Sequence, residues 1–184
     1  MKNLALHILD IVQNSIRAEA SLVDIYLYQS KKKNTIELVI KDDGKGMSQE
    51  MLKKVTDPYT TSRKERKVGL GISLLKQNAE QANGTFSISS GEGRGTMINA
   101  TFRLDHLDTP PLGDVIDTIV SLTTGNPKVD FIYSHITDQG EYIYDSRKVK
   151  EVLEDVPIYD SQVVTFLREM LRENIEESCG AESL

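Results

Sequence analysis

Cysteine is almost absent from this chain of 184 residues, and its scarcity excludes two kinds of stabilisation. Because Cys179 is the single cysteine, the chain cannot form an internal disulfide. A zinc site built from clustered cysteine and histidine is excluded for the same reason. We interpret Cys179 as an incidental residue of a disordered tail over residues 179–184, with a reactive thiol as the alternative.

Long apolar runs are also missing. The chain has no stretch of about 18 apolar residues, the length that a transmembrane helix requires, and no signal peptide at its N-terminus. We therefore expect a cytoplasmic protein without a membrane partner. Apolar residues make up 39% of the sequence, which is enough to build a core, and the length suits one or two domains.

Positive charge is scarce in the second part of the chain. Residues 1–108 contain 16 lysines and arginines against 13 acidic residues, whereas residues 109–184 contain 6 against 15. The first part is therefore mildly basic, with a net charge of +3, and the second is acidic, with a net charge of −9. This division argues against nucleic acid as a partner.

The most informative stretch is residues 42–47, with the sequence DDGKGM. It follows an expected buried strand over residues 35–40 and precedes an expected helix from Ser48. Asp42 can accept a hydrogen bond from the exocyclic amino group of a purine. Gly44 and Gly46 let the backbone approach a flat ring. The alternative is an ordinary turn between a strand and a helix.

A second stretch is an expected helix near the N-terminus. Its apolar stripe is formed by Leu4, Ile8, Ile11, Val12 and Ile16. Asp10 and Asn14 are four residues apart and share another face of the helix. A carboxylate can accept a proton and an amide oxygen can bind Mg²⁺. The alternative is a solvated polar face.

Two further stretches contain glycine pairs. Thr60 and Thr61 begin a basic segment that leads to Gly69-Leu70-Gly71 and an expected helix over residues 72–83. The N-terminus of a helix attracts anions, so this segment suits a polyphosphate, with a mobile charged loop as the alternative. Residues 91–96 form an expected glycine-rich hairpin, which is either a simple turn or a mount for the Thr96 hydroxyl.

Together these stretches resemble the motifs of the GHKL superfamily, which includes DNA gyrase, Hsp90, histidine kinases and MutL. Residues 10–15 resemble its N-box, residues 42–46 its G1 box, residues 69–71 its G2 box and residues 93–96 its last glycine-rich box. Residues 57–62 resemble the start of a histidine-kinase ATP lid. The resemblance covers residues 4–104 and implies the Bergerat fold, an α/β two-layer sandwich with a mixed sheet covered by helices on one face.

The resemblance also implies a set of site residues. Asn14 would ligate Mg²⁺, Asp42 would bind the adenine amino group, and Thr96 would support the adenine. Asp10 would be the catalytic base, although it is one methylene shorter than the usual glutamate. The residues that would contact the nucleotide are Asn14, Asp42, Gly44, Gly46, Met47, Thr60, Thr61, Lys64, Gly69, Leu70, Gly71 and Thr96.

The implied activity is binding of ATP with Mg²⁺ by a protein kinase or regulatory ATPase. His7, His106 and His135 lack a phosphoacceptor signature, so we expect any phosphoryl transfer to reach a separate partner protein. One alternative is a module that senses ATP or ADP without turnover. Another is an ATP-gated clamp of the MutL or gyrase type, which would function as a homodimer.

The sequence predicts a boundary before Pro110 and Pro111, dividing an ATP-binding domain over residues 1–108 from a small α+β region over residues 109–178. The expected order of this region is helix, two strands and two helices. The expected ranges are 112–122, 129–136, 141–144, 146–155 and 160–177. Such a short region has a marginal core, so we expect it to pack on the preceding domain or on a partner.

Overall fold

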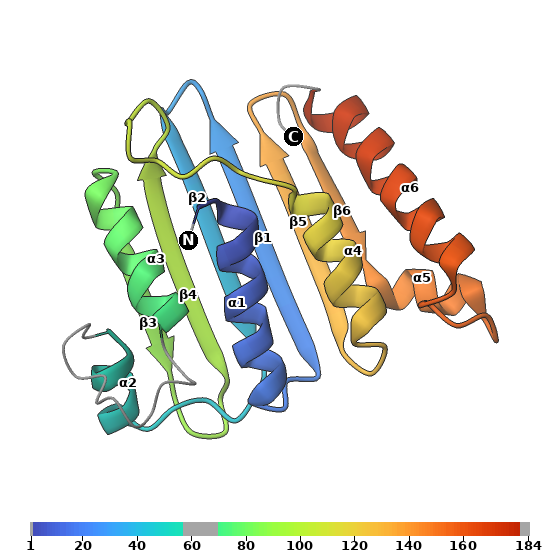
Figure 1. The fold of residues 1–184 in the computed structure, drawn as a ribbon, viewed down its shortest axis with the longest axis horizontal. Coiled ribbons are helices and arrows are strands. Elements are labelled where there is room, and N and C mark those ends of the chain that lie inside the picture. The colour runs from blue at the N-terminus through green and yellow to red at the C-terminus, as the bar shows by residue number, and fades with distance from the viewer. Residues whose placement is uncertain (1, 57–69, 181–184) are drawn as a thin grey trace.

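The computed structural model describes residues 2–56 and 70–180, which form a six-stranded sheet with helices on one face (Figure 1). The strand order across the sheet is β3-β4-β2-β1-β5-β6. The strands are β1 (Leu22–Ser30), β2 (Thr35–Asp42), β3 (Phe86–Ser90), β4 (Thr96–Arg103), β5 (Asp130–Thr137) and β6 (Glu141–Asp145). Only β1 and β5 pair in parallel among these strands, so the sheet is mixed.

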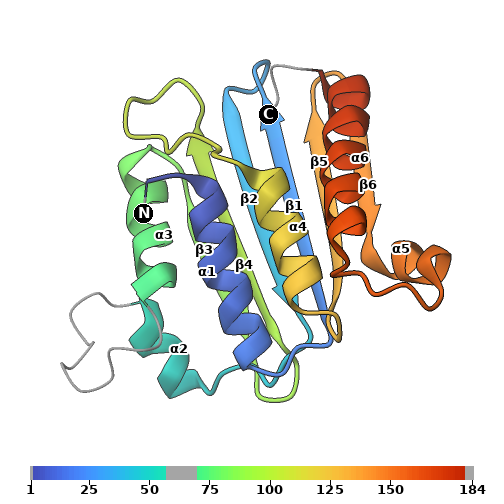
Figure 2. The same cartoon turned by 45° about the vertical axis from the view of Figure 1, so that its right-hand side comes forward.

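Four helices cover one face of the sheet: α1, α3, α4 and α6 lie in front of it in both views (Figures 1 and 2). The helices are α1 (Leu4–Arg17), α2 (Gln49–Thr56), α3 (Leu70–Gln81), α4 (Val115–Gly125), α5 (Ser146–Leu153) and α6 (Ser161–Cys179). This arrangement confirms the predicted fold class. Among the helices of residues 2–56 and 70–180, none combines the length and apolar character that crossing a bilayer requires.

The apolar residues that recur at helical spacing in α1 and at strand spacing in β2 face the core between the helices and the sheet. In the apolar stripe of α1, Leu4, Ile8, Ile11 and Val12 are buried and Ile16 is half-buried against the core. Asn3 caps the helix by accepting a hydrogen bond from the backbone N–H of Leu6. In β2 the buried residues alternate from Ile36 to Asp42, so Asp42 shares the covered face with the core. The register then sets Asp42 directly opposite Thr96 of β4.

The C-terminal region continues the same sheet. β5 pairs with β1 along eight residue pairs, from Leu22 with Asp130 to Gln29 with Thr137. The predicted order of helix, two strands and two helices is observed. Residues 109–178 therefore share a sheet with residues 1–108, and their division into a domain and an appended region stays a prediction.

Two details of this region differ from the expectation. Helix α4 begins at Val115 instead of residue 112, because Gly113 has a positive φ of 71° and the Asp114 side chain caps the helix. Helix α6 includes Cys179, whose side chain is buried and whose thiol donates to the carbonyl oxygen of His135 at 3.4 Å. The prediction that Cys179 belongs to a disordered tail is therefore wrong.

The start of α1 is joined to the segment that leads into α4. The backbone N–H of Leu4 donates to the carbonyl oxygen of Pro111, and that of Ala5 donates to the carbonyl oxygen of Leu112, both at 2.9 Å. These N–H groups belong to the first turn of α1, where backbone N–H groups have no acceptor within the helix. The C-terminal region therefore satisfies the first backbone donors of α1.

Candidate functional site

A cavity of about 290 Å³ lies between the sheet and helices α1, α2 and α3. Its apolar walls include Ile11, Ile40, Val55, Ile72 and Ile98. Its polar groups are Asn14, Ser15, Arg17, Asp42, Lys45 and Thr96. An apolar cavity with few polar groups is typical of a small-molecule site.

Asp42 is the acidic residue in the wall of this cavity, and both of its carboxylate oxygens are already hydrogen-bonded. The Ser15 hydroxyl donates to Oδ2 at 2.6 Å. The backbone N–H groups of Gly44 and Thr96 donate to Oδ1 at 3.0 Å and 3.2 Å. The neighbouring Asp43 instead accepts from the backbone N–H groups of Ser21 and Leu22. The Asp42 carboxylate thus lines the cavity, whereas the Asp43 carboxylate binds the loop to the backbone at the start of β1.

The glycines of the two glycine-rich segments bring those segments into contact. A Cβ on Gly46 would lie 1.9 Å from the carbonyl oxygen of Gly91, and a Cβ on Gly95 would lie 1.9 Å from that of Asp42. Both glycines also have positive φ, +67° and +73°. The N–H of Gly93 donates to the carbonyl oxygen of Lys45 at 2.7 Å. Gly46 and Gly95 are therefore required for the packing of the loop against the hairpin. For Gly46 this requirement adds to the predicted approach of the backbone to a purine ring.

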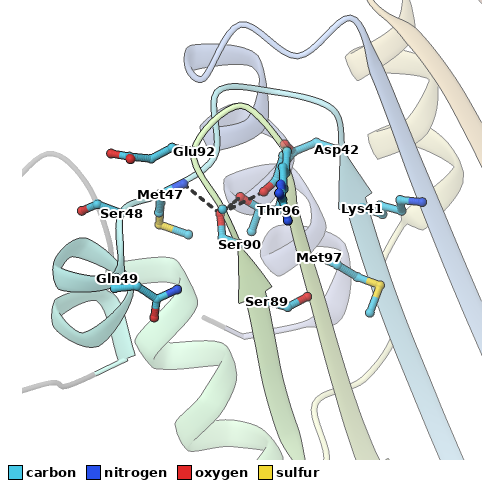
Figure 3. Close-up of a pocket in the computed structure, with 13 residues that line it drawn as sticks. Lys41, Asp42, Met47, Ser48, Gln49, Ser89, Ser90, Glu92, Thr96 and Met97 are labelled. Carbon is cyan, nitrogen blue, oxygen red and sulfur yellow. Dashed lines mark hydrogen bonds between the residues drawn. The ribbon is translucent and has the colours of Figure 1, made fainter.

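Ser90 connects the same two segments at the end of β3 (Figure 3). Its hydroxyl oxygen accepts from the backbone N–H of Met47 at 2.9 Å and lies 2.9 Å from the Thr96 hydroxyl. It also lies 2.9 Å from the carbonyl oxygen of Gly95, to which it donates. Ser90 therefore holds Met47 and the Thr96 side chain at the wall of the cavity.

An open groove of about 660 Å³ lies on the other side of that wall (Figure 3). It shares Asp42, Met47 and Thr96 with the cavity. Its other lining side chains include Lys41 and Met97, which alternate with buried core residues and so point to the face that the helices leave open. The groove is therefore more exposed than the cavity under the helices.

Asn14 lies at the edge of the cavity on α1, where its side-chain oxygen accepts from the Arg17 guanidinium at 3.1 Å. Lys45 also lines the cavity, and its ammonium pairs with Glu19 at 2.5 Å. Asp10 precedes Asn14 by one helical turn and is half-buried, but it does not line the cavity. The role of Asp10 as a base stays a prediction.

A metal ion at this site would have few protein ligands. Within residues 2–56 and 70–180, no three His, Cys, Asp or Glu side chains cluster in a way that could hold a metal. The Asn14 side chain offers one hard oxygen at the cavity edge. This donor set fits Mg²⁺, which is commonly held by one or two protein oxygens together with substrate phosphates and water.

The structure gathers only part of the predicted site. One cavity is lined by five of the predicted residues: Asn14, Asp42, Gly46, Met47 and Thr96. Gly44 does not line it, but its backbone N–H donates to Asp42. Helix α3 begins at Leu70, two residues before the predicted start, and Gly71 is buried in its first turn. Four predicted contacts lie outside the described residues: Thr60, Thr61, Lys64 and Gly69.

Four further polar residues at this site are not among the predicted contacts: Ser15, Arg17, Lys45 and Ser90. A signal for Ser15 does exist, because it follows Ile11 by four residues and so interrupts the apolar stripe of α1 with a hydroxyl. Its contact with Asp42 explains that exception. No comparable signal marks Ser90, which lies at the end of an alternating strand.

Two of the three histidines, His7 and His135, are buried. Burial lowers the pKa of His7 to about 4, and its Nε2 lies 2.9 Å from the Asn78 amide. Burial also lowers the pKa of His135 to about 4, and its Nδ1 lies 2.6 Å from the Tyr133 hydroxyl.

The family model described as "Histidine kinase-, DNA gyrase B-, and HSP90-like ATPase" matches residues 2–106. Since the match covers more than half of the chain, the protein belongs to this ATPase family. The resemblance inferred from the motifs is thereby confirmed, and the matched range agrees closely with the predicted one.

Curated relatives match about half of this chain. The chain is 32% identical over 103 residues to a putative sensor protein of Shewanella frigidimarina and 29% identical over 94 residues to sporulation kinase E of Bacillus subtilis. These alignments cover 55% and 50% of this chain but only 16% and 13% of the relatives. The chain therefore spans less than a fifth of the length of these two proteins.

A solved structure resembles most of the fold. The N-terminal domain of a DNA repair protein matches with a TM-score of 0.57 at 15% identity, covering 86% of this chain and 59% of that one. Such coverage extends beyond residues 1–108, so part of the C-terminal region has a counterpart there. At this identity the likeness concerns the fold alone.

Proposed function

We propose that the protein binds ATP or ADP with Mg²⁺ in the cavity between α1 and the sheet. The observation that carries this proposal is the position of Asp42, a carboxylate that is only 7% exposed in the wall of an apolar cavity. The adenine ring would occupy the space between the aliphatic walls. Its amino group would donate to Asp42, and Met47 and Thr96 would flank it.

The phosphates would extend toward the edge of the cavity that holds Asn14, Arg17 and Lys45. Two cations at this edge favour an anionic group there. Asn14 would ligate Mg²⁺ once its oxygen is released by Arg17. When bound, Mg²⁺ would neutralise charge on the phosphate oxygens. Thr60, Thr61, Lys64, Gly69, Leu70 and Gly71 complete the proposed nucleotide contacts.

The proposed reaction is phosphoryl transfer to a separate partner protein or regulated hydrolysis, with Asp10 as the base. One observation favours the nucleotide-sensing alternative: Asp10 does not line the cavity. A sensor would bind ATP or ADP and alter its partner without turnover. The third alternative is a homodimeric clamp, which would use the same nucleotide site and would dimerise when nucleotide binds.

Calorimetry with ATP and ADP, with and without Mg²⁺, tests this proposal, together with an assay for released phosphate in the same samples. Mg²⁺-dependent binding with release supports an ATPase. Binding without release supports the sensor or a kinase that lacks its acceptor. Light scattering in the same buffers would identify a clamp by a doubled mass with ATP. Failure to bind either nucleotide would overturn the proposal.

A further inference from the structure

A separate cavity of about 270 Å³ lies in the C-terminal region and shares no lining residue with the nucleotide cavity. We call it the α4–α6 cavity, because its residues come from the start of α4, from α6 and from β5 behind them (Figures 1 and 2). Its volume is close to the roughly 300 Å³ at which small-molecule sites begin. The residues that line it are Leu112, Gly113, Asp114, Val115, Ile116, His135 and Arg172.

His135 is the buried polar side chain of this cavity, with an exposed fraction of only 1%. Its Nδ1 lies 2.6 Å from the hydroxyl of Tyr133, a residue that does not line the cavity. Its Nε2 is also buried and has no hydrogen-bond partner among the described residues. The ring edge with Nδ1 is therefore committed to Tyr133, and the edge with Nε2 is left for the cavity.

The contact with Tyr133 assigns the hydrogen on this imidazole. The Tyr133 hydroxyl is fully buried, and within residues 2–56 and 70–180 its only acceptor is His135 Nδ1. A buried hydroxyl without an acceptor is costly, so the hydroxyl donates to Nδ1. Burial lowers the pKa of His135 to about 4, so near pH 7 the ring is neutral and its single hydrogen is on Nε2. His135 thus offers the cavity an unused N–H donor.

Helices α4 and α6 carry two combinations of an acid and a base, one helical turn apart, and only one of them is paired. Arg168 of α6 pairs with Asp117 of α4. One turn further along, Arg172 and Asp114 both line the cavity but form no ion pair. Arg172 has no other partner in the described part of the chain, and Asp114 caps α4 by accepting the N–H of Asp117 through Oδ1. The cavity therefore holds one unpaired base and one acid with a free oxygen.

We propose that the α4–α6 cavity binds a small amino acid with an apolar side chain. The ligand carboxylate accepts N–H groups from the Arg172 guanidinium, whose fork matches a carboxylate, and from His135 Nε2. The ligand ammonium pairs with Asp114, and the ligand side chain packs against the aliphatic walls. A zwitterion suits a cavity with one acid and one base, because a simple anion or cation would lie beside a like charge.

The wall that contains Leu112 and Gly113 is held in place by the start of α1. The carbonyl oxygen of Leu112 accepts the N–H of Ala5 at 2.9 Å. A Cβ on Gly113 would lie 2.5 Å from Cγ of Asn3, so this glycine packs closely against the residue that caps α1. A wall that is already fixed lowers the entropic cost of binding a ligand.

The test titrates L-valine and L-leucine into the whole chain labelled with ¹⁵N, in the absence of nucleotide, and follows binding by NMR. We expect the resonances of residues 112–116 and of the His135 Nε2–H to shift on binding. Two analogues of leucine each lack one charge: 4-methylpentanoate lacks the ammonium, and 3-methylbutylamine lacks the carboxylate. Each analogue should bind at least about tenfold more weakly than leucine.

Two variants connect each ligand charge to its protein partner. Arg172→Ala should weaken leucine binding about tenfold and remove the preference for leucine over 3-methylbutylamine. Asp114→Asn should have the same effect on leucine and remove the preference over 4-methylpentanoate, while asparagine still caps α4. Arg168→Ala is the matched control, because Arg168 is an arginine of the same helix that does not line the cavity, and it should leave the affinities unchanged. Circular dichroism establishes that each variant is folded.

Three results would each overturn the proposal. The first is a wild type that binds neither valine nor leucine. The second is equal affinity for leucine and its two analogues, which would reveal an apolar pocket without recognition of charge. The third is unchanged leucine binding in Arg172→Ala and Asp114→Asn, which would place the ligand elsewhere. A hydrogen found on Nδ1 of His135 in the same spectra would remove the donor on which the site depends. None of these results bears on nucleotide binding, because the two cavities share no residue.

Discussion

Met47 and Ser90 are joined by a hydrogen bond of 2.9 Å, from the backbone N–H of Met47 to the Ser90 hydroxyl oxygen. The bond connects the loop after β2 with the end of β3. Ser90→Ala would leave this N–H without its acceptor and would release the Thr96 hydroxyl. We expect a loss of about 1–2 kcal/mol in the free energy of unfolding, measured in urea, and weaker ATP binding. Ser87→Ala, at an exposed position of the same strand, should change neither.

Asp42→Ala should remove most nucleotide binding while leaving the fold intact. The substitution deletes the acceptor for the purine amino group, and hydrogen bonds to charged groups contribute about 1.5–3 kcal/mol, which corresponds to roughly a 10- to 100-fold loss of affinity. Calorimetry with ATP measures the loss. Lys41→Ala is the control, because Lys41 is exposed on the same strand and points to the open face. An Asp42→Ala protein that binds ATP as tightly as the wild type would remove the cavity from consideration.

Asn14→Ala should abolish the dependence of nucleotide binding on Mg²⁺. The substitution removes the hard oxygen that the Arg17 guanidinium contacts at 3.1 Å. ATP affinity measured with Mg²⁺ should fall to the value measured without it. The control is Gln13→Ala at the exposed neighbouring position, which should keep the metal dependence. An unchanged Mg²⁺ effect in Asn14→Ala would contradict the assigned role.

Two glycines of one hairpin should differ sharply in their tolerance of alanine. Gly93 and Gly95 both have positive φ, but a Cβ on Gly93 meets nothing within 4 Å, whereas a Cβ on Gly95 meets the Asp42 carbonyl oxygen at 1.9 Å. Gly93→Ala should therefore cost only backbone strain, about 1 kcal/mol. Gly95→Ala should cost at least about 3 kcal/mol. Urea unfolding of the pair measures the difference, and equal costs would refute the close packing of loop and hairpin.

Stability should fall as the pH drops below 6.5, because burial lowers the pKa of His135 from 6.5 to about 4. Between these values the unfolded chain binds a proton that the folded chain does not, so unfolding becomes easier as the pH falls. The contribution of His135 is complete above pH 6.5 and is lost toward pH 4. Urea midpoints measured down to about pH 5, where most carboxylates stay ionised, should decline more steeply for the wild type than for His135→Gln. Parallel declines would show that His135 is not responsible.

The sequence predicted the local elements well, because their signals are local. The stripe of α1 and the alternation of β2 each come from residues that are close in the chain, and the glycine pairs mark the turns. The pairing of β1 with β5 could not be predicted in the same way. It joins residues 22–29 to residues 130–137, and alternation identifies a strand without identifying its neighbour.

The site was predictable to the extent that its residues belong to motifs. Asp42 and Thr96 were identified separately, but their direct opposition depends on the register of β2 against β4. The contact of Ser15 with Asp42 depends in addition on how α1 is rotated on the sheet. Residues that act through such packing carry no motif of their own, so only the structure reveals them.

The backbone donors at the start of α1 have a consequence for where this protein can be divided. Residues 2–106 match the family model, yet the acceptors for the N–H groups of Leu4 and Ala5 are the carbonyl oxygens of Pro111 and Leu112. In a fragment that ends at residue 106, the N–H groups in the first turn of α1 would have only water as acceptors. The same helix carries Asn14 and Ser15. The range that matches the family is thus shorter than the part of the chain that supplies the acceptors for α1, which extends to at least residue 112.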